Sequence, residues 1–174
     1  PAVGNTKVLT ENDNLFTLAD QYTYKDGTIQ TGATVSGPIK RTLQSRLDDI
    51  VSIKSFGGVG DGSDQTTTLQ RAVDQLFINT ATKGTPQSRV TLVLEAGTYN
   101  ITNSIKVPPY ATIKGAGRNK TFIVQTGNYP IFTTVNSTST PGSYAADSSS
   151  TSLNQAQDII IEGMTLEHTL SSFT

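Results

Sequence analysis

Residues 51–76 constrain the fold of this chain more than any other stretch, and they read VSIKSFGGVGDGSDQTTTLQRAVDQL. A short apolar strand runs into a turn with four glycines, which allow positive φ and close approach to neighbouring chain. Asp64 is a suitable N-cap for a helix over residues 66–78. The apolar face of that helix holds Leu69, Ala72, Val73 and Leu76. The stretch therefore predicts a helix that covers one end of a strand-rich body.

The composition excludes several classes of function. A formal net charge of −1 over 174 residues argues against a nucleic-acid partner, which would need a basic face. The absence of cysteine excludes disulfides and thiolate metal sites, and the single histidine, His168, excludes a paired-histidine metal motif. No apolar run approaches the roughly 18 residues of a membrane span, and no nucleotide-binding glycine motif is present. We expect no membrane insertion and no cofactor.

From residue 90 onward the chain has the pattern of short strands bounded by Gly, Pro or Asn. The predicted strands cover residues 90–94, 98–101, 104–107, 111–114, 121–125, 131–135, 159–161 and 164–166. Residues 112–116 (TIKGA) and 160–164 (IIEGM) share a pattern and lie 48 positions apart. A coil of a strand-built solenoid usually takes roughly 20–30 residues, so the spacing leaves an excess that fits an insertion. We interpret Ile113 to Ile161 as one coil that carries an inserted Ser/Thr-rich loop over residues 136–154. Two coils without an insertion are the alternative.

A stack of coils would build its core from inward-facing apolar residues of successive turns. The predicted core residues are Leu92, Leu94, Ile105, Val107, Ile113, Ile123, Ile159 and Ile161. No capping pattern follows Leu166, and an open strand edge invites aggregation. We therefore expect the chain to be the N-terminal part of a longer protein, with coverage by partner subunits as the alternative.

The first 50 residues have a different character. Residues 1–36 hold short apolar patches separated by turns, which are too small to bury a core alone, so they must pack on the next domain, on copies of themselves or on a partner. In residues 37–50, Ile39, Leu43, Leu47 and Ile50 form a narrow apolar stripe that predicts a short neck helix. That stripe fits a coiled-coil seam around a three-fold axis or a helix docked on its own domain.

Catalysis on polysaccharides commonly uses two carboxylates roughly 5–9.5 Å apart. The candidates in this chain are Glu95, Glu162, Glu167 and His168. Glu162 follows the inward-facing Ile161, so an outward, solvated position explains it, and His168 is explained as a surface or packing residue. We therefore predict no catalytic, cofactor-binding or metal-binding residue in this chain.

Other polar residues also have ordinary structural explanations. Asp61 and Asp64 lack the ligand spacing of a calcium loop and suit turn and capping roles. Arg118 and Lys120 are candidates for contact with an anionic glycan, but a polar turn between strands explains them as well. The same holds for the tyrosines at strand ends and for three chance glycosylation sequons: Tyr99, Tyr110, Tyr129 and Tyr144, and Asn100, Asn119 and Asn136.

The glycine turn and the helix start closely resemble the opening of pectate-lyase-like right-handed β-helices, especially those of bacteriophage tailspikes. In that family a turn D-F-G-A-x-G-D-G, followed by D-D-T-x-A-I-Q-x-A, leads into the first coil. Here residues 55–62 read SFGGVGDG and residues 64–72 read DQTTTLQRA, so Ser55 and Gln65 replace two aspartates. The resemblance runs from about residue 40 to the end of the chain, and its specific motif marks a fold start rather than a reaction.

The resemblance implies a mainly β fold: the start of a right-handed parallel β-helix with an N-terminal capping helix, preceded by a neck and an anchoring segment. It further implies a virion tailspike or tail fibre that is a homotrimer. Residues 1–36 would attach to the phage tail, baseplate or adaptor proteins, and the parent β-helix would recognise host surface polysaccharide. Whether the parent protein is a depolymerase stays open. The alternatives are a secreted polysaccharide lyase or glycoside hydrolase and a non-enzymatic glycan-binding adhesin.

Overall fold

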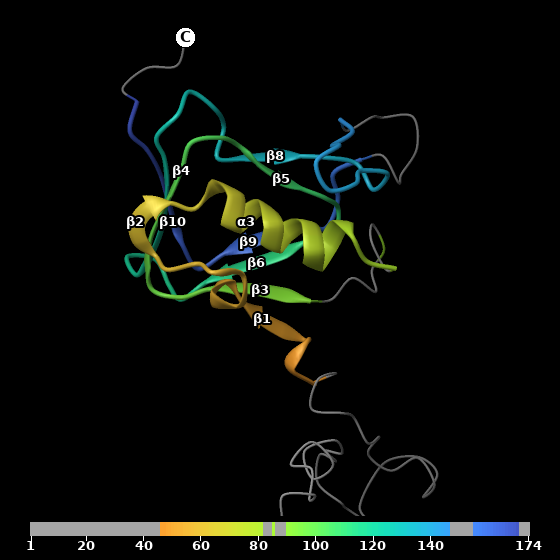
Figure 1. Cartoon of the computed structure of the whole chain (residues 1–174), viewed down its shortest axis with the longest axis horizontal. Coiled ribbons are helices and arrows are strands. Elements are labelled where there is room, and N and C mark those ends of the chain that lie inside the picture. Colours follow the sequence, from red (N-terminus) through yellow and green to blue (C-terminus); the bar gives the residue numbers. More distant parts are fainter. Residues whose placement is uncertain (1–45, 82–84, 86–89, 147–154, 171–174) are drawn as a thin grey trace, which may run out of the picture. The chain divides into compact units, whose positions relative to one another are not determined.

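The computed structural model describes residues 46–81, 85, 90–146 and 155–170. The chain divides into two units, residues 1–48 and residues 49–174, and the second unit holds the strands and helices discussed here (Figure 1). The predicted anchoring segment over residues 1–36, most of the predicted neck and part of the predicted loop lie outside the described residues. Within the described part, no helix is long and apolar enough to cross a membrane.

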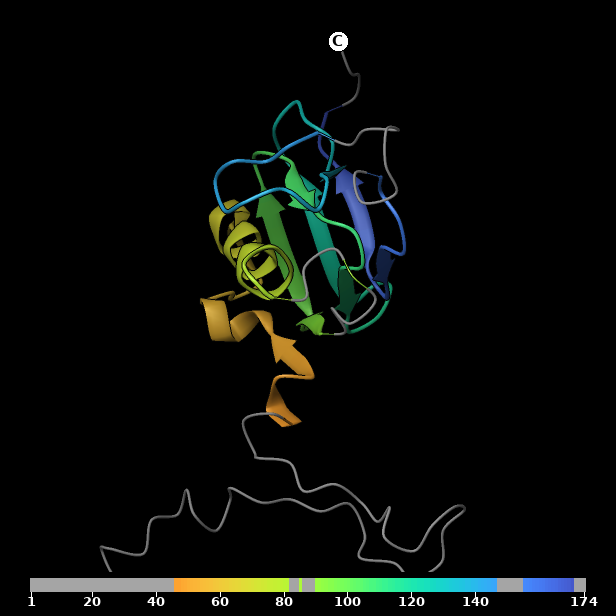
Figure 2. The same cartoon turned by 90° about the vertical axis from the view of Figure 1, so that its right-hand side faces the viewer.

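The described strands form three parallel sheets. The first sheet contains β1 (Ile50–Ser52), β3 (Thr91–Leu94), β6 (Thr112–Gly115) and β9 (Ile160–Glu162). The second contains β2 (Asp61–Asp64), β4 (Gly97–Ile101), β7 (Thr121–Gln125) and β10 (Thr165–His168). The third contains β5 (Ile105–Val107) and β8 (Phe132–Thr134). The chain visits the sheets in turn and each strand pairs with its counterpart one turn away, so the fold is a stack of coils (Figure 2).

Successive coils stack in register. Leu92 of β3 pairs with Ile113 of β6, which pairs in turn with Ile161 of β9. The first step spans 21 positions and the second 48. The two copies of the repeated sequence pattern are therefore neighbours in one sheet, one coil apart, and the extra length lies between β8 and β9.

The core fills the space between the sheets. Six predicted core residues are fully buried: Leu92, Leu94, Ile105, Val107, Ile113 and Ile123. Ile159 and Ile161 are only partly buried and pack against that cluster. Leu166 pairs with the buried Ile123 but is 46 % exposed, because no described coil lies beyond β10. The alternation of buried and half-buried residues along β3, β4 and β7 follows from the two-residue period of a strand.

The predicted helix is present as α3 (Thr66–Val73), which continues as the π-helical turn η2 (Asp74–Ile78). Its buried residues, Leu69, Ala72, Val73, Phe77 and Ile78, belong to the core, whereas Leu76 is only partly buried. The predicted N-cap is wrong by one residue. The carbonyl of Gln65 accepts the first helical bond from Leu69 N–H at 2.8 Å, while Asp64 Oδ1 accepts the N–H of Thr66 at 3.0 Å.

The sequence pattern placed two other segments incorrectly. Ile50 is the first residue of β1 rather than the end of the neck helix, and β1 is followed by the 3₁₀ turn η1 (Ile53–Phe56). The polar strand β2 lies within the stretch that the sequence presented as a glycine turn. Parallel pairing with β4 holds β2 in place, with a shift of register between Asp61 and Asp64. Both β1 and β2 are stabilised by pairing with strands that are distant in sequence, and a local sequence pattern does not reveal such pairing.

In the first coil, α3 takes the place that a strand of the third sheet occupies in later coils. Its polar side chains bond to the neighbouring backbone. The Gln70 side-chain amide accepts from Lys106 N–H at 2.7 Å and donates to Lys106 C=O at 3.2 Å, and Thr66 Oγ1 accepts from Thr102 N–H at 2.8 Å. The edge of β5 is thereby hydrogen-bonded without a further strand. That α3 closes the end of a longer solenoid stays a prediction.

The corner after the first sheet leaves no room for side chains at two glycines. A Cβ added to Gly115 would clash with the carbonyl oxygen of Gly163 in the next coil and would lie 2.9 Å from Met164 Cβ. Gly163 itself has φ +69, a conformation that L-residues rarely adopt. The stacking distance between coils therefore fixes the residue type at this corner.

We predict that Gly115→Ala lowers the free energy of unfolding by about 1–3 kcal/mol, because the added methyl group overpacks the contact between coils. Urea unfolding followed by circular dichroism measures this change. Lys120→Ala, an exposed substitution in the following turn, serves as the control and should stay within about 0.5 kcal/mol of the parent. Equal stability of both variants would contradict the close packing at Gly115.

Candidate functional site

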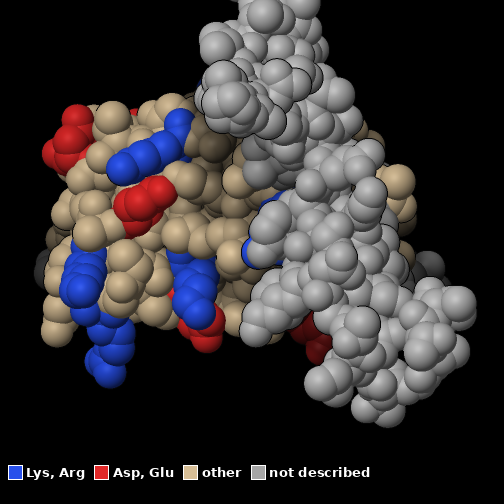
Figure 3. All heavy atoms as spheres, turned by 90° about the horizontal axis from the view of Figure 1, so that it is seen from below, with Lys and Arg blue, Asp and Glu red and all other residues tan. Residues whose placement is uncertain are grey.

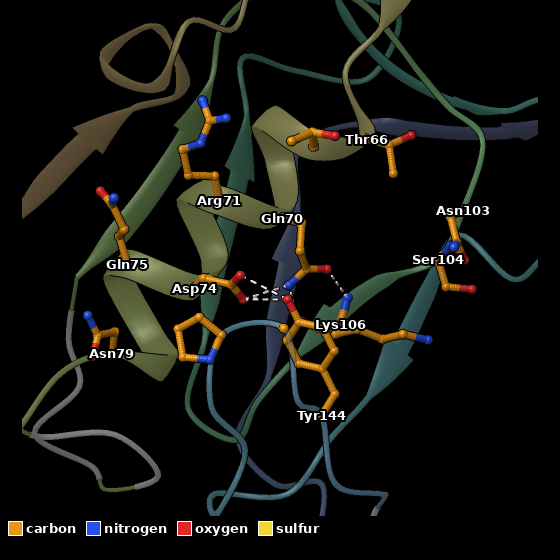
Figure 4. Close-up of a pocket in the computed structure, with 13 residues that line it drawn as sticks. Thr66, Gln70, Arg71, Asp74, Gln75, Asn79, Asn103, Ser104, Lys106 and Tyr144 are labelled. Carbon is orange, nitrogen blue, oxygen red and sulfur yellow. Dashed lines mark hydrogen bonds between the residues drawn. The ribbon is translucent and has the colours of Figure 1, made fainter.

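An open groove of about 570 Å³ runs along the polar face of α3 and η2 (Figure 4). One wall comes from the helix, mainly through Thr67, Gln70, Arg71, Asp74, Gln75 and Asn79. The other sides come from Asn103, Ser104 and Lys106 around the start of β5, and from Pro141, Gly142 and Tyr144 of the loop after β8. The groove thus collects side chains from the first, second and third coils.

A hydrogen-bond network crosses the floor of this groove. The Tyr144 hydroxyl donates to Asp74, with distances of 2.8 Å to Oδ2 and 3.1 Å to Oδ1. The Gln70 amide donates to Asp74 Oδ1 at 2.9 Å and also bonds to the backbone of Lys106, as described above. Asp74 is thus held by two donors, and the loop of the third coil is tied to the helix of the first.

The environment of Tyr144 favours its neutral form. Burial of the ring raises the pKa of the phenol, and the hydrogen bond that it donates to the Asp74 carboxylate raises that pKa further. At neutral pH the hydroxyl is therefore a hydrogen-bond donor whose proton is directed at Asp74.

Several other polar side chains around the groove make no such hydrogen bonds to the rest of the described residues. Within the described part of the chain, no side-chain hydrogen bond or ion pair engages Thr67, Arg71, Gln75, Asn79, the hydroxyl of Ser104 or the ammonium of Lys106. Hydroxyl, amide and cationic groups of this kind can bond to the hydroxyls and acidic groups of a ligand. The arrangement is suited to binding a polar, hydroxylated molecule.

The described residues of the groove do not supply the carboxylate pair that hydrolysis of a glycosidic bond commonly requires. Asp74 is the one carboxylate among the residues that line it. Nor do the described residues include a cluster of three His, Cys, Asp or Glu side chains that could hold a metal ion. The groove can bind a ligand, but it lacks the paired carboxylates of a glycosidase.

Glu95 lies at the corner between β3 and β4, away from the groove residues. Its carboxylate accepts a hydrogen bond from Ser52 Oγ, and its backbone carbonyl accepts from the hydroxyl of Tyr99 at 3.2 Å. The carbonyl also accepts from buried Thr121 Oγ1 at 3.0 Å. Burial and the charge of Glu95 raise the pKa of Tyr99. These contacts join three coils at one corner and indicate a structural role for Glu95.

The other carboxylate candidates lie on different sheets. Glu162 of β9 is exposed and pairs with Lys114 of the adjacent strand at 3.0 Å, an arrangement that contributes roughly 0–1 kcal/mol at a surface. Glu167 of β10 is exposed and lies in register with Val124. The Nδ1 atom of His168 accepts from Leu170 N–H at 3.0 Å. The structure does not bring these residues to the groove.

The acidic turn residues make local bonds. Asp61 accepts from the N–H and hydroxyl of Ser63 at 2.9 and 2.6 Å, and these bonds lower its pKa. Bonds from the hydroxyl and N–H of Thr66 lower the pKa of Asp64 in the same way. Carboxylates that accept such bonds are turn and capping elements, as their spacing suggests.

The remaining candidates are spread over the surface and the loops. Arg118, Asn119 and Lys120 form an exposed turn between β6 and β7, where Asn119 has φ +63. Tyr129 is 50 % exposed, whereas Tyr99 is buried. Asn136 is buried and donates to Ala146 C=O at 2.9 Å, so it stabilises the loop that carries Tyr144 rather than exposing a glycosylation site. Of the tyrosines singled out in the sequence, Tyr144 is the one that lines the groove.

Sequence reasoning missed the rest of the groove. Gln70 and Asp74 stand four residues apart on the polar face of a helix, a pattern that normally marks a solvated surface. Lys106 stands between two buried residues of β5, which is ordinary strand alternation. Their association depends on the stacking of coils, which places residue 106 beside residue 70, and on the return of the loop to residue 74.

The surface elsewhere carries charges of both signs. Figure 3 shows Lys and Arg side chains interspersed with Asp and Glu side chains on one face of the molecule, separated by uncharged residues. Such a mixture produces no extended field of a single sign. On this face, a preference for a ligand of one charge would therefore come from local features.

Residues 50–169 match the family described as Rhamnogalacturonase A/epimerase, pectate lyase-like. The match covers about two thirds of the chain and includes every strand of the stacked coils. This chain belongs to that family. Comparisons with curated proteins and with solved structures found no match.

We predict that Tyr144→Phe lowers the free energy of unfolding by about 1 kcal/mol, because it removes the hydrogen bond to Asp74. The effect should also depend on pH. The raised pKa of Tyr144 means that its contribution is complete below about pH 10 and is lost as pH rises through the folded-state pKa. Urea unfolding between neutral pH and pH 11 should therefore show a smaller alkaline loss in the variant.

Tyr129→Phe is the matched control, since its side chain is half exposed and makes no hydrogen bond within the described residues. Tyr99 shifts in the same direction as Tyr144, so some alkaline loss should persist in the Tyr144 variant. If the two variants and the parent lose stability in parallel, the link between Tyr144 and Asp74 is not present in solution.

Proposed function

We propose that this chain is the virion-proximal part of a phage tailspike or tail fibre, and that its β-helix recognises polysaccharide on the host surface. Residues 1–36 attach the protein to the tail, baseplate or adaptor proteins, and three copies of the chain associate. The protein is located in the virion and acts outside the host cell.

The observation that carries the proposal is the combination of stacked parallel coils with a separate segment before them. Residues 50–169 belong to a family whose description refers to enzymes of pectic polysaccharides, which supports a polysaccharide as the ligand. The division of the chain after Asp48 supports a distinct attachment segment. The glycine turn and helix start, which resemble those of tailspikes, favour the phage assignment.

A secreted lyase or glycoside hydrolase is the second candidate, and the family match is compatible with it as well as with the first. The third candidate is a non-enzymatic adhesin, which would also bind glycans but would not be part of a virion. The groove, which holds one carboxylate, favours binding over hydrolysis at that position. Oligomeric state, taken together with product formation, separates the tailspike from the secreted enzyme.

We predict that the purified chain binds bacterial surface polysaccharides and releases no product from them. Affinity electrophoresis on a panel of capsular polysaccharides and lipopolysaccharides measures binding. Assays for new reducing ends and for the absorbance of unsaturated uronates detect hydrolysis and elimination. Release of product by a monomeric chain would favour the secreted enzyme, and binding to none of the polysaccharides would contradict the proposal.

We also predict that the chain is a trimer in solution and that Leu47→Asp dissociates it. Leu47 belongs to the apolar stripe of the predicted neck and is 57 % exposed. Placing a charge in an apolar seam is strongly unfavourable. Light scattering coupled to size exclusion gives the mass, with three times 18.5 kDa expected for the parent. Val59→Asp alters another exposed apolar residue, outside the stripe, and should leave the trimer intact. A monomeric parent would contradict the neck as a trimer seam.

A further inference from the structure

We propose that the groove along α3 binds an acidic oligosaccharide, with its acidic groups facing Arg71 and Lys106. This inference rests on the proposed recognition of polysaccharide and assigns both a place and a ligand class to it. The groove volume of about 570 Å³ lies within the range of roughly 300–1,000 Å³ that is common for ligand sites.

The charge of the groove differs in sign from that of the chain. The chain has a formal net charge of −1, but the described residues that line the groove include two cations, Arg71 and Lys106, and one carboxylate, Asp74. A hollow with an excess of one sign of charge attracts ions of the opposite sign. The excess positive charge therefore favours an anionic ligand.

The carboxylate of Asp74 does not offset the cations by pairing with them. It accepts hydrogen bonds from Tyr144 and Gln70 instead. Neither Arg71 nor the ammonium of Lys106 has a side-chain partner within the described residues. Both remain available for charge-assisted hydrogen bonds, which are stronger than those between neutral groups.

The two cations are separated along the groove. Figure 4 shows the guanidinium of Arg71 and the amine of Lys106 on different sides of the Asp74–Tyr144 pair. An extended chain with repeated acidic groups can pass this pair and present an acidic group to the cation on each side of it. The separation therefore favours an oligomer over a monosaccharide or an inorganic anion.

Uncharged polar groups that line the groove suit the hydroxyls of a sugar. Gln75, Asn79 and Ser104 offer donors and acceptors along the groove. The half-buried ring of Tyr144 adds an apolar surface, and its hydroxyl is already bonded to Asp74. Apolar surface with a few placed polar groups is typical of small-molecule sites.

The exposed turn of Arg118 and Lys120 is the competing basic feature. Both residues are exposed, and neither lines the groove. A projecting turn surrounds little of a ligand, so each contact there is weakened by solvent and salt. We therefore assign the site to the groove and use this turn as a comparison.

Calorimetry on the full chain tests the inference with a matched pair of probes, an oligogalacturonate and its methyl ester, which differ in charge. Oligomers of hyaluronan and mannuronate extend the set. We expect Arg71→Gln and Lys106→Gln each to weaken binding of an acidic oligomer by about tenfold and the double variant by more. Added salt should weaken binding to the parent far more than to the double variant.

Lys54→Gln, an exposed cation outside the groove, is the matched control and should bind as the parent does. Circular dichroism and melting temperature establish that the variants fold. The inference is overturned if the methyl ester binds as well as the acid, if the groove variants bind like the parent, or if substitution of Arg118 and Lys120 abolishes binding instead. In those cases the polysaccharide panel can still show binding, so the proposed function survives; failure of that panel would reject both.

Discussion

Parallel pairing between one coil and the next is the constraint on which the rest of the structure depends. Every strand must find its backbone partners on neighbouring turns, because an unpaired buried N–H or C=O costs about 1–3 kcal/mol. The described residues of the first coil include no strand of the third sheet, and Gln70 meets the requirement by bonding to both backbone groups of Lys106. The side chain of Gln70 thus supplies the hydrogen bonds that a neighbouring strand would otherwise supply. It also donates to the carboxylate of Asp74 in the groove.

Much of the fold could be predicted because it is recorded locally. The alternating pattern of β3 to β10, the amphipathic face of α3 and the repeat shared by residues 112–116 and 160–164 are all visible without coordinates. The predictions that were wrong concern segments whose structure depends on strands distant in sequence. The polar strand β2 has no alternating apolar pattern and exists because β4 lies beside it. Ile50 suited a helical stripe equally well until its pairing with Thr91 decided the matter. The strand β10 extends to His168, beyond the predicted end at Leu166, because its last residues pair with β7.

The groove was almost invisible to sequence analysis for the same reason. Its residues belong to an ordinary helix surface, an ordinary strand and a loop with no periodic pattern. Tyr144 was noted as an aromatic residue, but its partner, Asp74, lies 70 positions earlier. The candidate carboxylates show the opposite case. Glu95 and Glu162 were considered as catalytic residues because of their residue type, but Glu95 bonds to Ser52 and Glu162 pairs with Lys114. The residues of the groove are brought together by the stacking of the coils, which the sequence does not show directly.

The corner between the first two sheets has a consequence for how such a chain can change over time. Backbone contacts there leave no space for a methyl group at Gly115, so neither longer turns nor larger residues can be accommodated without spreading the coils. The passage from the third sheet back to the first is different, since a long segment already fits between β8 and β9. New length, and with it new specificity, can accumulate at that passage, so related proteins can diverge in this exposed loop while their stacked interiors stay similar.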